Sequence, residues 1–287
     1  MPRLSLVLGF ILLGGAACAT DISPSRLIAP RDPSAIVYGS IDASNTYANV
    51  GAFIVQRKSD GRVSPICSGT LISPTVFLTA GHCTAYFETL SPSEYAAGVS
   101  FDNPIAWGDL TDTHTNIIPA ISVITNPEYN RRQSDPADLG VLILASHDTR
   151  GIAAAALPTL GLLDQLFAAG TLQSKRFTPV GYGLQDRVVG RGLPYFQDQN
   201  PIPRMYAFSS FSALDPAYLR LSQNRSTGDG GTCYGDSGGP NFVPTGGTLI
   251  LAATTVTGDN VCRATNVDYR LDTRSARRFL GQYVTLP

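Results

Sequence analysis

Short apolar runs separated by turn residues are the dominant pattern along this chain. An apolar run over residues 52–57, a turn at residues 59–61 and a second run over residues 67–79 predict a β-hairpin. Residues 139–144 are continuously apolar, which is typical of a buried strand. Further strand-like runs follow at residues 176–180, 206–211, 249–256 and 267–271. The pattern predicts an all-β protein.

Two segments depart from this strand pattern. Residues 151–170 are rich in Ala, Leu and Gly and carry a charge only at Asp164, which predicts a crossing between two halves of the protein. Near the C-terminus, apolar residues recur at the spacing of one helical face, and Asp272 or Thr273 can cap the helix. The residues of this face are Ala276, Phe279, Leu280, Tyr283 and Val284. We expect a terminal helix that packs this face on the second half.

The start of the chain has the order of an export signal. Arg3 supplies a positive charge, residues 4–13 are apolar, and small residues surround a cleavage site at residues 17–19. We therefore expect residues 1–19 to be a signal peptide and the mature protein to be secreted or periplasmic. Residues 4–19 are shorter than the about 20 residues that a membrane span needs, so no stable span is expected.

The rest of the N-terminal region leaves further possibilities. Cys18 allows a lipoprotein, although Gly15 stands where such a signal carries a bulky residue. After signal cleavage the chain would begin at Thr20. Residues 20–35 contain three prolines and no periodic apolar pattern, which predicts a pro-segment or linker.

Composition and charge exclude several classes of protein. The 287 residues are 43% hydrophobic and 15% charged, which argues against a disordered tail, a coiled coil and a collagen-like rod. The 21 Lys and Arg balance 22 Asp and Glu, and no basic run is longer than the arginine pairs at 131–132 and 277–278, so nucleic acid is not an expected partner. No assembly signal is visible in the sequence, and we expect a monomer.

The cysteine count matters because the chain is expected to be exported. Loss of Cys18 with the signal leaves an even number of cysteines, which predicts two disulfides. The remaining cysteines are Cys67, Cys83, Cys233 and Cys262, and their order alone leaves three pairings open. The chain has only three histidines and neither a C-x-x-C nor an H-E-x-x-H motif, so we expect no metal site and no other cofactor.

A serine flanked by glycines is the clearest chemical feature of the sequence. Ser237 lies in Gly-Asp-Ser-Gly-Gly-Pro at residues 235–240, where the glycines leave its hydroxyl exposed and backbone N–H groups free to face a ligand. The same spacing occurs in the nucleophile elbow of α/β-hydrolases, which carry their histidine after the serine. In this chain His82, His114 and His147 all precede the serine. The order therefore excludes an α/β-hydrolase.

A serine nucleophile needs a base and a carboxylate that orients the base. His82 follows an apolar run and is next to a cysteine, whereas His114 and His147 lie in polar runs typical of surface loops. Asp138 directly precedes the buried run, and Asp135 is an alternative that lies farther from it. The chain order of histidine, aspartate and serine is one of the three recurring orders of a catalytic triad.

Four segments together resemble the trypsin/chymotrypsin family of serine endopeptidases. They are Ser-Gly-Thr-Leu-Ile at 68–72, Leu-Thr-Ala-Gly-His-Cys at 78–83, Asp-Leu-Gly-Val at 138–141 and Gly-Asp-Ser-Gly-Gly-Pro at 235–240. The resemblance implies two six-stranded antiparallel β-barrels and a C-terminal helix, with the active site between the barrels. The implied peptidase domain covers residues 36–287, with a first barrel at about 36–150, the crossing at 151–170 and a second barrel at about 171–287.

The resemblance also implies roles for individual residues. Ser237 would attack the scissile carbonyl, His82 would take its proton and deliver it to the leaving amine, and Asp138 would orient the imidazole. The backbone N–H groups of Gly235 and Ser237 would form the oxyanion hole. The implied disulfides are Cys67–Cys83 and Cys233–Cys262.

The implied substrate pocket has no acid at its floor. Gly231 stands where trypsin-like members carry a carboxylate, with Thr232 beside it, and Gly258 and Val267 would form the walls. A basic side chain would find no buried partner charge there, so we expect cleavage after uncharged, small to medium apolar residues. If Asp268 occupied the wall position instead, affinity for basic residues would return.

The resemblance extends to an activation step. Residues 36–39 (Ile-Val-Tyr-Gly) resemble the start of activated family members, whose freed amine pairs with the aspartate before the serine, here Asp236. A buried carboxylate at this position would need such a partner. Ala35 is not a site for a trypsin-like protease, and the nearest basic residue is Arg31. We expect an activating protease to cut near Ile36; the alternative is a first strand that is never trimmed.

These features predict a secreted serine endopeptidase that acts on proteins or peptides. A non-catalytic binding protein on the same fold is the alternative, because a fold does not determine function. Such proteins usually lose a triad residue, and all three candidates are present here. An esterase with little activity on peptides is a third possibility.

Overall fold

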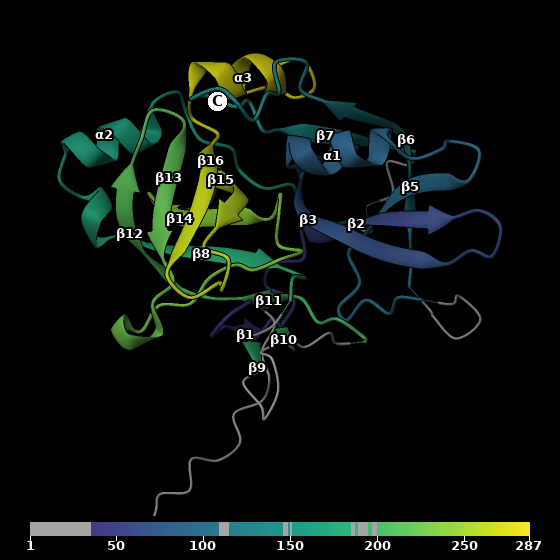
Figure 1. The fold of residues 1–287 in the computed structure, drawn as a ribbon. Coiled ribbons are helices and arrows are strands. Elements are labelled where there is room, and N and C mark those ends of the chain that lie inside the picture. The colour runs from purple at the N-terminus through teal and green to yellow at the C-terminus, as the bar shows by residue number, and fades with distance from the viewer. Residues whose placement is uncertain are drawn as a thin grey trace, which may run out of the picture. The chain divides into compact units, whose positions relative to one another are not determined.

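The computed structural model describes residues 36–108, 115–145, 149, 151–184 and 200–287, and the backbone alone at 187–188 and 195–196. Most of the described strands form two barrels, which lie side by side in Figure 1, the first in purple and blue and the second mainly in green and yellow. The expected signal peptide and the segment 20–35 lie outside the described residues, as do His114 and His147. No helix among the described residues has the length and apolar character to cross a membrane.

The first barrel closes with six antiparallel strands. In order around the barrel they are β2 (Val50–Arg57), β3 (Val63–Ser73), β4 (Val76–Thr79), β7 (Gly140–Leu144), β6 (Ile118–Thr125) and β5 (Tyr95–Ser100), which pairs with β2. The hairpin predicted from the apolar runs is confirmed as β2 and β3. The second of those runs divides into β3 and β4, and the apolar run at 139–144 is the buried strand β7.

The second barrel also closes with six antiparallel strands. They are β8 (Arg176–Gly181), β12 (Ser209–Leu214), β13 (Tyr218–Ser222), β16 (Thr265–Arg270), β15 (Thr248–Gly258) and β14 (Pro240–Thr245), which pairs with β8. Two short strands extend β8, namely β11 (Met205–Tyr206) and β1 (Ser40–Ile41), and β9 (Arg187–Val188) pairs with β10 (Tyr195–Phe196). The expectation of two six-stranded antiparallel barrels is confirmed.

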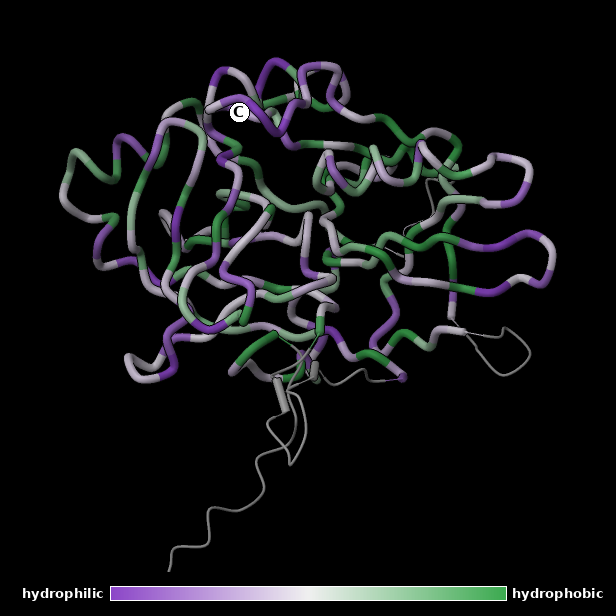
Figure 2. The backbone as a smooth tube through the Cα atoms, viewed as in Figure 1, coloured by the Kyte–Doolittle hydropathy of each residue, from purple (hydrophilic) through white to green (hydrophobic). Residues whose placement is uncertain are grey.

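Apolar packing joins the two barrels. Figure 2 shows hydrophobic residues along the strands and hydrophilic residues at the tips of several hairpins. One cluster of buried side chains combines Val50 and Leu78 of the first barrel with Val180, Phe242 and Leu251 of the second. Because protein interiors pack at the density of organic crystals, this shared core fixes the facing ends of the barrel strands relative to each other.

Among the described residues, helices are few and short. They are α1 (Gly81–Glu88), α2 (Leu162–Ala168) in the crossing segment, α3 (Arg274–Leu280), and the 3₁₀ turns η2 (Leu172–Ser174) and η3 (Arg225–Thr227). The expected terminal helix is α3, and the Thr273 side chain caps it by accepting a hydrogen bond from the N–H of Ala276. The helix ends before Tyr283 and Val284, which still pack against the shared core.

The segment that begins at Ile36 belongs to the second barrel by its pairing. Val37 bridges to Gly231, and β1 pairs with β11. The expected first barrel covered residues from about 36 to 150. In the structure, the strands of the first barrel begin only at β2. Buried Asp42 then anchors the chain between the barrels through an ion pair with Arg204 at 2.9 Å.

Candidate active site

The histidine and the aspartate come from the facing ends of neighbouring strands. His82 is the second residue of α1, just after β4, and Asp138 precedes β7, which pairs with β4. Oδ1 of Asp138 accepts the backbone N–H of His82 at 2.7 Å, and Oδ2 lies 3.0 Å from Nδ1 of the ring. Gly81 permits this approach, because a Cβ there would lie 2.9 Å from the backbone of Leu139.

The alternative carboxylate has another partner. Asp135 accepts a hydrogen bond from the hydroxyl of Tyr269 at 2.6 Å. Asp138 is the carboxylate at the imidazole of His82, and it is only 6% exposed. A carboxylate that accepts from Nδ1–H holds the neutral ring in the tautomer whose Nε2 can take a proton.

The loop that carries Ser237 turns so that two N–H groups stay unpaired. The carbonyl of Cys233 accepts the N–H of Asp236 at 3.1 Å, and the carbonyl of Asp236 accepts the N–H of Gly239 at 2.8 Å. Gly235 has φ of 95°, a conformation that side chains other than glycine rarely adopt. The N–H groups of Gly235 and Ser237 donate to no described residue, so they can receive a negative oxygen.

First-barrel residues hold this loop beside the histidine. Ser68 donates its N–H to the carbonyl of Ser237 at 2.9 Å and its hydroxyl to the carbonyl of Gly235 at 3.0 Å. Gly238 lies against the end of β4, since a Cβ there would be 2.1 Å from Oγ1 of Thr79. The structure describes both Ser237 and His82, and Ser237 Oγ makes no hydrogen bond to the ring of His82. Catalytic hydrogen bonds are often long until substrate is bound.

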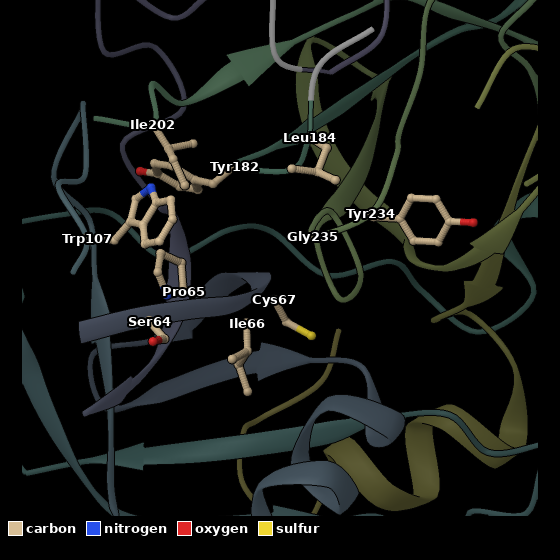
Figure 3. Close-up of a pocket in the computed structure, with 10 residues that line it drawn as sticks. All are labelled: Ser64, Pro65, Ile66, Cys67, Trp107, Tyr182, Leu184, Ile202, Tyr234 and Gly235. Carbon is tan, nitrogen blue, oxygen red and sulfur yellow. The ribbon is translucent and has the colours of Figure 1, made fainter. Parts of the chain in front are cut away.

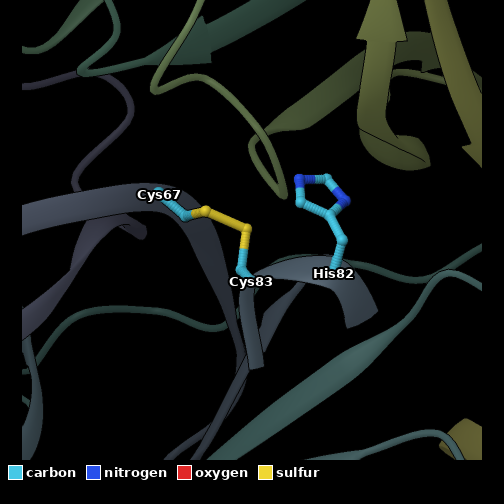
Figure 4. Close-up of side chains that lie close together, drawn as sticks. All are labelled: Cys67, His82 and Cys83. Atoms are coloured by element: carbon cyan, nitrogen blue, oxygen red, sulfur yellow. A yellow bond between two sulfur atoms is a disulfide. The ribbon is translucent and has the colours of Figure 1, made fainter. Parts of the chain in front are cut away.

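Both disulfides implied by the resemblance are confirmed. Cys67 and Cys83 join β3 to α1, with Cα atoms 6.4 Å apart, and Cys233 and Cys262 join the serine loop to the segment after β15, at 5.2 Å. Figure 4 shows the ring of His82 close beside the first disulfide. His82, Cys67 and Cys83 place ligand atoms within 4.8 Å of one another, but the oxidised sulfurs offer no thiolate to a metal.

Asp236 is a buried carboxylate that receives hydrogen bonds from two backbone N–H groups of the described residues. It accepts the N–H groups of Gly183 at 2.8 Å and Cys233 at 2.9 Å. Burial raises the pKa of Asp236 to about 7, although these two N–H donors lower it. No cationic side chain among the described residues pairs with this carboxylate. Ile36, the expected new N-terminus, is itself fully buried.

A cavity of about 140 Å³ opens beside Ser237. It is lined by Thr232, Cys233, Tyr234, Ser237, Cys262 and residues 255–260. Of the expected substrate-binding residues, Thr232 and Gly258 line this cavity. Gly231 lies behind it, against the side chain of Gln223, and Val267 lies on β16 outside the lining. Asp268 is fully buried and does not form a wall either.

A second cavity, of about 300 Å³, is lined in part by Tyr234 and Gly235 of the serine loop. Figure 3 shows Trp107, Tyr182 and Ile202 gathered at one end, while the ring of Tyr234 stands apart. This apolar cavity could not be predicted from the sequence, because its walls come from segments far apart in the chain. The one available signal is that Trp107 is the single tryptophan of the sequence.

The fold and these residues define a class: a two-barrel protein with a His-Asp pair on the first barrel and a glycine-flanked serine on the second. Comparison with known proteins agrees with this class. The family model described as Trypsin matches residues 41–279, so the chain belongs to the trypsin family. Ovochymase from Halocynthia roretzi is 27% identical over 248 residues. That alignment covers 83% of this chain and 15% of the ovochymase, so the chain spans only a small part of this relative's length.

Proposed function

We propose that this protein is a serine endopeptidase in which Ser237 is the nucleophile, His82 the general base and Asp138 the residue that orients the base. One arrangement carries the proposal: an imidazole hydrogen-bonded to a buried carboxylate lies beside a serine loop with two unpaired N–H groups. Loss of a single oxyanion-hole donor typically costs about 100- to 1,000-fold in turnover. The N–H groups of Gly235 and Ser237 would therefore contribute strongly to the reaction rate.

The reaction follows from the proton positions. Asp138 accepts from Nδ1–H, so Nε2 of His82 receives the proton of Ser237 Oγ as that oxygen attacks the carbonyl carbon. The carbonyl oxygen becomes negative and accepts the N–H groups of Gly235 and Ser237. His82 then gives the proton to the leaving amine, and water releases the acyl group by the same route.

The substrate residue before the cleaved bond would enter the cavity lined by Thr232 and Gly258. We propose that it is uncharged and small or medium in size. Two observations support this: the cavity measures about 140 Å³, and Asp268 is sealed from it. A basic side chain would lose its hydration there without gaining a buried partner charge.

Secretion and activation by proteolysis belong to the same proposal. The leader at residues 1–19 and the two disulfides support export. Asp236 supports a cut before Ile36, because the freed ammonium would supply the cation that this buried carboxylate lacks. The proposed enzyme works as a monomer without a metal or other cofactor.

Hydrolysis of matched peptide and ester substrates by the processed protein tests the proposal. We expect both to be cleaved, with rates reduced by about 10⁴-fold or more in His82→Ala and Ser237→Ala. Cleavage of esters alone would indicate an esterase. If a chain that begins at Ile36 cleaves neither substrate, the endopeptidase proposal is wrong and a binding protein on this fold is favoured.

A further inference from the structure

Five polar side chains are buried together beneath the cavity beside Ser237. They are Thr232, Asn241 of β14, Thr255 of β15, and Asn266 and Asp268 of β16, and each is at most 5% exposed. Asn266 and Asp268 are two residues apart on one strand, so both side chains point to the same face. Buried polar groups destabilise a protein unless they are hydrogen-bonded. The way these groups pair therefore determines which hydrogen-bond donors and acceptors remain available to a side chain in the cavity.

Hydrogen bonds link these side chains in a line that ends at the cavity. Asn241 donates to Oδ1 of Asp268 at 2.7 Å, Asn266 donates to the amide oxygen of Asn241 at 3.0 Å, and the Thr232 hydroxyl donates to the amide oxygen of Asn266 at 2.7 Å. The second N–H of Asn241 reaches the Thr255 hydroxyl at 3.0 Å. We call this line, from Asp268 to Thr232, the polar relay.

The chemistry of its buried end determines the direction of the polar relay. Oδ1 of Asp268 accepts whether the carboxyl is ionised or protonated on Oδ2, which has no hydrogen-bond partner among the described residues. Asn241 must therefore turn its NH2 toward Asp268 and its oxygen toward Asn266. Asn266 in turn presents its oxygen to Thr232 and accepts the hydrogen bond of that hydroxyl. Thr232 Oγ1 is left with lone pairs only, so it can accept from the cavity but cannot donate.

A second buried acceptor lies next to this position. Oε1 of Gln223 has no hydrogen-bond partner and lies where a Cβ on Gly231 would be, at 2.2 Å. The amide of Gln223 donates instead to Asp259. Asp259 also accepts the backbone N–H groups of Ala264 and Thr265, so this rim carboxylate is occupied by its own loop.

We propose that the polar relay makes the cavity select an uncharged substrate residue that carries a hydrogen-bond donor, such as Thr, Ser, Asn or Gln, before the cleaved bond. This selectivity rests on the proposed endopeptidase function. It narrows the expected substrate residue from any uncharged residue to one whose side chain donates a hydrogen bond. An apolar side chain of the same shape would displace water from Thr232 Oγ1 and leave this acceptor unpaired.

Peptides that differ only in the residue before the cleaved bond test the proposal. Thr and Val have nearly the same shape, and we expect kcat/KM to be about tenfold higher for Thr, which corresponds to one neutral hydrogen bond. Gln should exceed Met, and methionine sulfoxide, which only accepts, should be no better than Met. Equal rates for Thr and Val, or a preference for Arg or Lys, would overturn the proposal.

Variants separate the polar relay from general packing. Thr232→Val should abolish the preference for Thr over Val, and Thr232→Ser should keep it. Asn266→Leu frees the Thr232 hydroxyl to donate, so methionine sulfoxide should gain relative to Met. Thr254→Val is the matched control, because it removes a fully buried and unpartnered hydroxyl of β15 that does not line the cavity, and it should leave every ratio unchanged.

Labelling by a fluorophosphonate probe separates two kinds of failure. If Ser237 is labelled but Thr and Val peptides are cleaved equally, the proposed function holds. The proposal that the polar relay selects the substrate residue is then wrong. A processed protein that is not labelled loses the proposed function, and the selectivity proposal fails with it. If Asn266→Leu is not labelled, the comparison of Thr232→Val with Thr232→Ser tests the polar relay, because only Thr232→Ser should keep the preference for Thr over Val.

Discussion

At the residue scale, Asp138 has a structural role and, in the proposed function, a chemical one. One carboxylate oxygen accepts the backbone N–H of His82 at the start of α1, and the other meets Nδ1 of the ring. The same group therefore positions both the main chain and the side chain of His82, the proposed base. A base held at two points loses little conformational freedom when substrate binds, which favours reaction geometry.

Replacing this carboxylate should remove activity without unfolding the protein. We expect Asp138→Asn to lower kcat about 10⁴-fold near neutral pH, because an amide stabilises the wrong tautomer of the ring. Peptide hydrolysis measures the effect. Asp135→Asn is the matched control, since Asp135 bonds Tyr269 instead, and it should retain most activity. Equal losses in the two variants would contradict the assignment of Asp138.

Asp236 should make the stability of the uncut chain depend on pH. Its folded pKa of about 7 exceeds the about 3.9 of an unfolded aspartate, so the folded state binds more protons between these values. The free energy of unfolding should therefore fall as pH rises from about 4 to 7, by on the order of 1–4 kcal/mol. Urea unfolding of uncut Ser237→Ala measures this fall.

The comparison for that experiment is the same chain with Asp236→Asn. This variant has no carboxyl to ionise, so its slope over the same pH range should be smaller. A chain cut before Ile36 should also lose the fall, because its ammonium lowers the pKa of Asp236. Identical slopes with and without Asp236 would show that this carboxyl does not titrate as described.

At the element scale, the serine loop depends on a backbone that only glycine tolerates. Gly235 combines a φ of 95° with close contact, since a Cβ would lie 3.0 Å from Cα of Gly183. We expect Gly235→Ala to lower kcat about 100- to 1,000-fold through the oxyanion hole. Gly247→Ala, at φ of 81° in the β14–β15 turn with open space around it, is the control and should keep kcat. Equal losses of kcat in the two variants would indicate a general effect on folding and would contradict a role of Gly235 in the oxyanion hole.

The elements that sequence analysis predicted are those with strong local patterns. The β2–β3 hairpin and β7 follow from apolar runs, and α3 from helical spacing and its Thr273 cap. β14 does not follow from any such pattern, because it contains two prolines and the buried polar Asn241. Its place in the barrel depends on pairing with β8 and β15, which are distant or later in the chain.

The candidate triad could be predicted, but the pocket walls could not. Motifs identified His82, Asp138 and Ser237 because their chemistry requires those residue types. The walls depend on register, and a β-bulge between Thr255 and Thr257 shifts the pairing of β15 with β16. A slip of one residue turns a side chain to the other face of a strand, so local sequence could not assign Val267 or Asp268.

At the scale of the whole molecule, the two barrels assemble one site. Ser68 on the first barrel bonds the loop of Ser237 on the second, and Arg204 and Asp42 join the segment after Ile36 to both. Arg204 is fully buried and also donates to the carbonyl of Val50 on β2. The stability of the site is therefore tied to the contact between barrels.

Breaking the buried ion pair should destabilise this contact. We expect Arg204→Met to cost about 3–5 kcal/mol of unfolding free energy, because Asp42 is left as an unpaired buried charge. Combining it with Asp42→Asn should recover part of the loss, since neither remaining group is charged. Urea unfolding measures both. A double variant as unstable as the sum of its single variants would argue against coupling between the two residues.

The most direct test of Ser237 as the nucleophile is the intact mass of the processed protein before and after a fluorophosphonate probe, with Ser237→Ala alongside. The mass reports the N-terminus and the nucleophile in one spectrum. We expect a chain that begins near Ile36 to gain one probe adduct, and Ser237→Ala to gain none. A trimmed chain that gains no adduct, or a Ser237→Ala variant that is still labelled, would contradict the account.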